Sequence, residues 1–230
     1  MAFKLALLLM MMTLYLAACQ VVPDLPPASP PGASDAAEPT AEAHDGWATH
    51  ENNGVTLSIQ IPDGWQSYRT ADGIVLSEYI GTAETAGHLQ GILMYVFVPR
   101  MDIFELPTSD DVNLAWAVLK QVVHNPDYVG RALASEPQAF EWDHHDAAYY
   151  LLNNRDGTLT LLLAMGLPGR KLLVSHISLP ESHAARLRPL LPNLLATLTV
   201  NGEQIDPSAL NHLPDPLVFP ADESGEGSAG

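Results

Sequence analysis

The sequence predicts an α+β domain, in which an antiparallel β-sheet is flanked by helices on both faces. Three observations lead to this fold class. Strand-like runs are joined by turn dipeptides, among them Asp72-Gly73 and Asp156-Gly157, which favour antiparallel hairpins. Two runs are apolar at nearly every position, as is typical of strands covered on both faces. Two other segments carry apolar side chains at helical spacing and can supply that cover.

The strands are recognised by alternation, apolar runs and turns. Residues 55–61 alternate apolar and polar side chains strictly, as a strand with one buried face does. Asp72-Gly73 joins two short runs into a hairpin, residues 66–69 and 74–79. The continuously apolar runs are expected at the centre of the sheet, and they are residues 92–98 and 159–165. Two further turns predict an antiparallel meander of residues 147–154, 158–166 and 171–179.

Two helices are expected as the cover of this sheet. Thr108-x-x-Asp111 resembles a capping box, and apolar side chains at helical spacing follow it as far as Val123. The second helix is expected at about residues 189–198, where leucines form one stripe and two prolines fall within the first turn. Apolar stripes of this kind are more typical of a core than of a ligand site.

The N-terminus has the parts of an export signal. Lys4 precedes the apolar run 5–16, and small residues then lead to Cys19, the only cysteine. The run is shorter than the ~20 residues that a helix needs to cross a bilayer, so we expect a cleaved signal. Residues 16–19, Leu-Ala-Ala-Cys, resemble the lipobox of bacterial lipoproteins. This resemblance implies that residues 1–18 are a lipoprotein signal peptide and that Cys19 carries a lipid anchor. The alternative is an ordinary signal with a coincidental cysteine.

Composition divides the rest of the chain into three parts. Residues 19–45 are the lipidated N-terminus and a Pro/Ala-rich linker that is expected to be disordered. Residues 46–200 are expected to form one globular domain, and residues 201–230 an acidic, largely disordered C-terminal tail. The chain has 27 acidic against 10 basic side chains, a net charge of −17. Such a charge disfavours nucleic acid and anionic lipid headgroups, so membrane contact is expected through the acyl chains of Cys19 alone.

Two segments of the domain resemble a known family. Residues 55–65, Val-x-Leu-x-Ile-x-Ile-Pro-x-Gly-Trp, resemble the start of PsbP/Mog-like domains, and the leucine-rich residues 187–200 resemble their last helix and strand. Bacterial lipoproteins of the LpqN type combine such a domain with a lipobox and a Pro/Ala-rich linker. The resemblance covers about residues 46–200. It implies an α/β/α sandwich and a binding or assembly role, because this fold is not tied to one chemistry.

The densest group of candidate ligands is His144, His145 and Asp146. Imidazole and carboxylate groups bind Zn²⁺ and other divalent metals. Neighbouring residues of a strand point to opposite faces, so a shared ion would need a turn at this place. The interpretation we favour is a polar turn at residues 143–146 between two strands. We therefore predict no bound metal and no cofactor.

A second candidate is His176, which interrupts an apolar strand and could line a ligand pocket. A core or edge histidine that is hydrogen-bonded to backbone is the more common explanation of such a residue. The sequence has no nucleophile-elbow, zinc-protease or phosphate-loop motif.

These observations predict a non-enzymatic, membrane-anchored binding or assembly module. Its domain would face the extracytoplasmic side of the cell membrane or outer membrane. Membrane lipid, through Cys19, and an envelope protein are the expected partners, and nucleic acid is not. Two alternatives stay open. One is a small-ligand carrier with a pocket between sheet and helix, and the other is a metal-dependent enzyme that uses His144 and His145.

Overall fold

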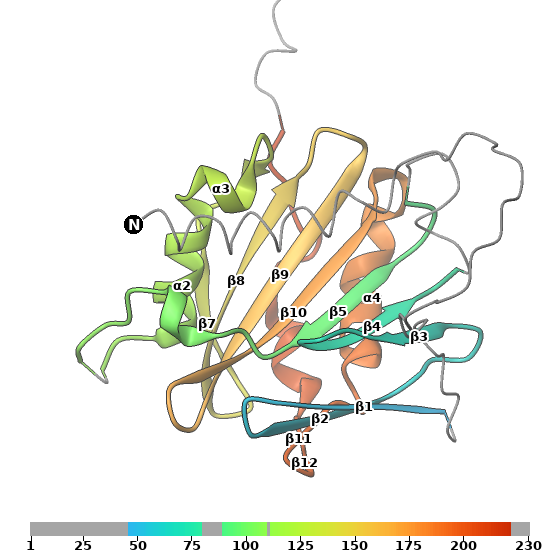
Figure 1. Cartoon of the computed structure of the whole chain (residues 1–230). Coiled ribbons are helices and arrows are strands. Elements are labelled where there is room, and N and C mark those ends of the chain that lie inside the picture. Colours follow the sequence, from blue (N-terminus) through green and yellow to red (C-terminus); the bar gives the residue numbers. More distant parts are fainter. Residues whose placement is uncertain (1–45, 80–88, 110, 222–230) are drawn as a thin grey trace, which may run out of the picture.

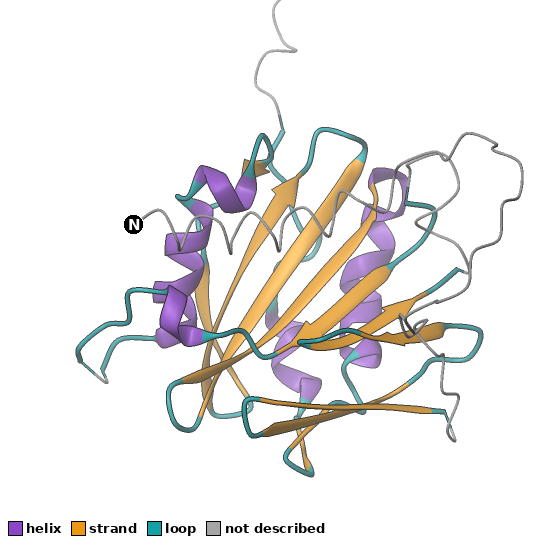
Figure 2. Ribbon diagram, viewed as in Figure 1, coloured by secondary structure: helices purple, strands orange, loops and turns teal. Residues whose placement is uncertain are grey.

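The computed structural model describes residues 46–79, 89–109 and 111–221, whose strands form two antiparallel sheets (Figures 1 and 2). The predicted fold class, α+β with antiparallel strands and a helix on each face of the main sheet, is confirmed. The predicted signal peptide, lipidation site and linker lie outside the described residues. No helix in the described ranges is long and apolar enough to cross a membrane.

The main sheet has eight strands in the order β3-β4-β5-β10-β9-β8-β6, and β7 also pairs with β8. Every neighbouring pair is antiparallel. The predicted hairpin β3–β4 and the predicted meander β8–β9–β10 are both present. The strands are β3 Gln66–Arg69, β4 Gly73–Ser77, β5 Leu93–Phe97, β6 Leu133–Ala134, β7 Gln138–Trp142, β8 His145–Asn153, β9 Thr158–Leu167 and β10 Lys171–Pro180.

A second, four-stranded sheet was not predicted. Its order is β1-β2-β11-β12, with β1 Trp47–Asn52, β2 Val55–Gln60, β11 Thr199–Val200 and β12 Glu203–Gln204. The alternation of β2 is confirmed, because Val55, Leu57 and Ile59 are buried between more exposed neighbours. One edge of β2 pairs with β1 and the other with β11, so β2 is not part of the main sheet.

The helices differ from their predicted limits. They are α2 Leu114–Val123, α3 Pro126–Val129 and α4 Ala184–Leu194, with 3-10 helices η2 Met101–Ile103, η3 Glu181–His183 and η4 Pro207–His212. Asn113, not Thr108, caps α2, because its side-chain oxygen accepts the Trp116 N–H at 2.8 Å. α4 begins earlier than expected and keeps both prolines in its interior. Burial of its leucine stripe offsets the backbone hydrogen bonds that the prolines remove.

The two faces of the main sheet carry separate cores. Side chains of β8 alternate between them, with Tyr149 and Leu151 on one face and Tyr150 and Leu152 on the other. The first face packs against α4 and the small sheet, and we call it the α4 face. The second face packs against α2, and we call it the α2 face. In Figure 1, α4 lies behind the sheet and α2 lies beside β7 and β8.

The packed chain continues past the predicted end of the domain at residue 200. Ile205, Leu210, Leu213 and Leu217 are all buried in the core on the α4 face. The expectation of a largely disordered tail from residue 201 onward is therefore wrong for residues 201–221. The segment is acidic and contains several prolines, but these few apolar side chains attach it to the domain.

Candidate functional site

A row of five side chains crosses the α2 face of the main sheet. The strand register aligns Tyr68 with Val75, Val75 with Tyr95, Tyr95 with His176, and His176 with Leu162. All five are partly exposed. We call these five residues the open row. At a strand spacing of ~4.8 Å, five neighbouring strands make it about 20 Å wide.

The open row exists because α2 covers only one side of its sheet face. α2 packs chiefly on β8 and β9, and it buries Tyr150, the next residue in register after Leu162. Figure 2 shows the described helices of this face gathered at the β7–β8 side, away from β3, β4 and β5. The prediction that β5 is covered on both faces is therefore wrong. Its α4 face is buried, while Tyr95 and Phe97 on the α2 face are partly exposed.

The open row itself contains no Asp, Glu, Lys or Arg side chain. The rings of Tyr95 and Phe97 stack with centroids 4.4 Å apart, and the Thr70 hydroxyl donates to the Tyr95 hydroxyl at 3.1 Å. At the other end, the hydroxyls of Thr160 and Ser178 are 2.9 Å apart. The hydroxyls here have partners, so the surface combines aromatic and aliphatic contact area with satisfied polar groups.

His176 lies in the middle of the open row. Burial lowers the pKa of its imidazole to about 4, so the ring is neutral at neutral pH. Among the described residues no hydrogen bond to the ring is present, and neither of the two surface cavities described below is lined by His176. The structure thus places this candidate on an apolar surface. The hydrogen bond from this histidine to backbone, which is the more common arrangement, is not present among the described residues.

The other candidates, His144, His145 and Asp146, lie at the β7–β8 hairpin. Asp143 and His144 have positive φ angles, 50° and 63°, and form the two-residue turn of this hairpin. The His144 side chain is 93% exposed and its Nδ1 is 3.3 Å from Glu141 Oε1. His145 begins β8 opposite Trp142. In the described part of the chain, no group of three or more His, Cys, Asp or Glu side chains is arranged to hold a metal ion.

These three residues do border a cavity of about 470 Å³. Its other walls are the segment before α2 and the β9–β10 turn, where the Arg170 guanidinium donates to the carbonyl oxygen of Pro107. Cationic and anionic groups are mixed around it, with Arg170 beside Asp146. The arrangement has no single charge preference, and we assign no ligand to it.

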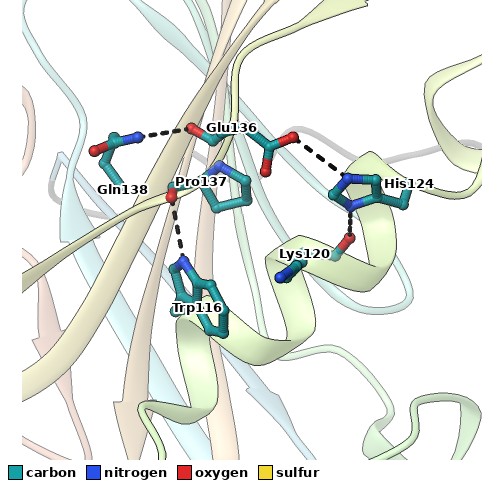
Figure 3. Close-up of polar contacts among 6 residues, drawn as sticks. All are labelled: Trp116, Lys120, His124, Glu136, Pro137 and Gln138. Atoms are coloured by element: carbon teal, nitrogen blue, oxygen red, sulfur yellow. Dashed lines mark hydrogen bonds and ion pairs between the residues drawn. The ribbon is translucent and has the colours of Figure 1, made fainter.

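The contact between α2 and the sheet edge was not predicted. The Trp116 indole N–H donates to the carbonyl oxygen of Pro137 at 3.2 Å, and His124 Nε2 is 3.3 Å from Glu136 Oε1 (Figure 3). Lys120 lies over the Trp116 ring, 4.7 Å from its centroid. These contacts join α2 to the segment between β6 and β7. No sequence pattern indicates them, because the partners are up to 21 residues apart.

Comparisons with known proteins find a similarity of structure and no match of sequence. No protein-family model matches the sequence, and no curated protein matches it. Among solved structures, the chain is similar to cyanobacterial PsbP (CyanoP) from Synechocystis sp. PCC 6803. The TM-score is 0.42 and the sequence identity 14%, over 72% of this chain and 98% of that chain. Values this low say nothing of what this chain binds, so its resemblance to PsbP/Mog-like lipoproteins stays a prediction.

Proposed function

We propose that the protein is a non-enzymatic binding or assembly module, anchored to the bacterial cell envelope through Cys19, which holds a partner protein on its open row. The observation that carries the proposal is the half of the α2 face that no described helix covers. Natural domains rarely leave a contiguous apolar surface without a use, and such surfaces commonly mark interaction sites. The export signal and the lipobox-like residues 16–19 support the location.

The chemistry of the open row defines the partner. Tyr68 and Tyr95 supply aromatic area with a polar tip, Val75 and Leu162 supply aliphatic area, and His176 is neutral. The chain as a whole carries a net charge of −17. An uncharged surface on so acidic a molecule suits an apolar, uncharged segment of another protein, because a charged group buried here would have no counter-ion in the row.

Site-specific crosslinking in the native envelope tests this proposal. A photo-crosslinking amino acid at Tyr95 should give a discrete protein adduct, whereas the same residue at Thr49, which is exposed on β1, should not. Val75→Glu should abolish the Tyr95 adduct, because it places an unpaired carboxylate in the interface. Equal labelling from both positions would contradict the proposal. A small molecule in the adduct, in place of a protein, would favour the ligand-carrier alternative.

A further inference from the structure

The free edge of the main sheet at β7 has backbone groups without partners. β7 pairs only with β8, and the two-residue turn at Asp143-His144 makes Trp142 and His145 the closing hydrogen-bonded pair. Hydrogen-bonded and non-bonded pairs alternate along an antiparallel ladder. The N–H and C=O groups of Ala139 and Glu141 therefore point away from β8. Within the described ranges they have no backbone hydrogen bond, and both residues are exposed.

Contacts at both ends hold this edge in place and leave its middle free. At the start, the carbonyl oxygen of Pro137 accepts the Trp116 indole N–H, and the Glu136 carboxylate contacts His124, as Figure 3 shows. At the end, the Trp142 indole N–H donates to the carbonyl oxygen of Asp206 at 3.0 Å. The strand is thus pre-organised, which reduces the entropy that a partner strand must overcome on pairing.

A cavity of about 250 Å³ with mainly apolar walls adjoins this edge on the α4 face, and Ser135, Glu136 and Gln138 form its polar part. Tyr149, Leu151 and Leu217 form its buried wall, and Val218, which is 75% exposed, forms its rim. Tyr149 is 8% exposed, so most of its ring is buried and only a small part of the side chain faces the cavity. An apolar side chain of a ligand could contact this buried wall.

The α2 face of the same edge carries two exposed carboxylates. Glu141 lies opposite Asp146 in the ladder, so both side chains point to this face, and both are exposed. Glu136, where the edge strand begins, lines the cavity on the α4 face, and its carboxylate is 3.3 Å from His124 Nε2. The two sides of the edge therefore differ in character, with a mainly apolar cavity on one side and the carboxylates of Glu141 and Asp146 on the other.

We propose that the β7 edge binds an extended peptide segment as an added strand, with alternating apolar and basic side chains. Side chains of a strand alternate between the two faces. The apolar residues would lie against the cavity at Tyr149, and the basic residues against Glu141 and Asp146. The backbone groups of Ala139 and Glu141 supply the hydrogen bonds that such strand addition uses. This site is separate from the open row.

Peptide titration of the purified full-length protein tests the site. The probe is a fluorescent heptapeptide of alternating lysine and valine with leucine at its centre, and anisotropy measures its binding. We expect saturable binding, and replacing the central leucine by alanine should weaken it several-fold. A heptapeptide with glutamate in place of lysine should not bind. No saturable binding of the lysine peptide below about 1 mM would overturn the proposal.

Two variants, each with a matched control, and one peptide modification separate strand pairing from charge attraction. Ala139→Pro removes an outward N–H without removing a bond to β8, and should weaken binding at least tenfold, whereas Ala139→Val should not. Glu141→Lys should weaken binding more than Glu203→Lys, which changes the net charge equally on β12. N-methylation of alternate peptide residues leaves the protein untouched. Methylation of the residues whose N–H groups face β7 should abolish binding. Methylation of the other residues should leave binding unchanged.

Equal binding by both N-methylated peptides would show charge attraction alone and would overturn the site. Val75→Glu, in the open row, should leave peptide binding unchanged, so failure of this site and failure of the proposed function are distinguishable.

Discussion

Arg188 Nη2 on α4 donates to the carbonyl oxygen of Asn211 at 2.6 Å, and its Nε donates to the carbonyl oxygen of Leu213 at 3.1 Å. The arginine is 8% exposed, so its charge is held mainly by these oxygens. Both carbonyls lie at the C-terminal end of η4, where backbone oxygens have no partner within the helix. This contact joins the C-terminal segment to the core on the α4 face.

Arg188→Met should therefore destabilise the domain by about 2 kcal/mol, because it leaves the buried Leu213 carbonyl unsatisfied and removes the part-buried bond to Asn211. Arg188→Lys keeps the charge but cannot reproduce both bonds, and its loss should be smaller. Urea unfolding at neutral pH measures both values. A methionine variant as stable as the parent would show that the guanidinium contributes nothing net to the folded state.

The C-terminal segment also shows what sequence reasoning lacked. Its acidic composition predicts disorder, but Ile205, Leu210, Leu213 and Leu217 are buried. Leu210, Leu213 and Leu217 have helical spacing, but Pro214 and Pro216 exclude a regular helix there, so the spacing does not mark them as core. Arg188, 25 residues before Leu213, also holds this segment, and no local pattern indicates that contact.

The open row could not be predicted from the sequence, because β5 is apolar on both faces. In β2, the alternation of apolar and polar residues correctly predicted which face is buried. In β5, both faces are apolar, so the sequence cannot show that the Tyr95 face is only partly covered. That depends on where α2 packs, and α2 packs on β8 and β9. The turn at Asp143 and His144 could be predicted from the sequence, because a polar pair between two strands favours a turn.

The ion pair between Glu78 and Arg186 should make the stability of the domain depend on pH. Arg186 Nη2 is 2.6 Å from Glu78 Oε1, and Glu78 Oε2 accepts the Ile92 N–H at 3.0 Å. Burial acts to raise the pKa of the Glu78 carboxyl, but the hydrogen bonds from Arg186 and Ile92 outweigh it and leave the pKa below its ordinary value of 4.5. The carboxylate therefore adds stability that is complete above pH 4.5 and is lost as pH falls through the lower folded-state pKa.

Glu78→Gln should lose about 1 kcal/mol at pH 7 and show a weaker fall in stability below pH 4.5. Thermal unfolding between pH 3 and pH 7 measures both effects, with the exposed Glu51→Gln as the matched control. Parallel pH profiles for the parent and Glu78→Gln would contradict the assignment.

Ser175 and Ser178 on β10 form a contrasting pair. Ser175 Oγ is buried on the α4 face and has no hydrogen-bond partner among the described residues, whereas Ser178 Oγ is 2.9 Å from Thr160 Oγ1. Ser175→Ala removes an unsatisfied hydroxyl and should raise the free energy of unfolding by about 1 kcal/mol. Ser178→Ala leaves the buried Thr160 hydroxyl with one partner fewer and should lower it. Equal effects of the two changes would show that burial alone, not pairing, decides their cost.

Cys19→Ser tests the anchor. If Cys19 is acylated, the variant should either appear as a soluble, folded domain or accumulate as unprocessed precursor, because serine offers no thiol for the lipid. Fractionation of cells fed a labelled fatty acid measures both location and acylation. A processed variant that stays in the membrane fraction would show that something other than the acyl chains holds the protein there, contrary to the proposal.

His144→Gly separates a turn residue from a metal ligand. His144 adopts a φ of 63°, which strains a side-chain-bearing residue, and the second position of this turn type favours glycine. The substitution should therefore raise the free energy of unfolding by about 0.5–1 kcal/mol. The bound metal content of protein purified without a His-tag should be sub-stoichiometric and the same in parent and variant. If the variant is instead less stable and a chelator destabilises only the parent, His144 holds a metal ion and the interpretation as a turn residue fails.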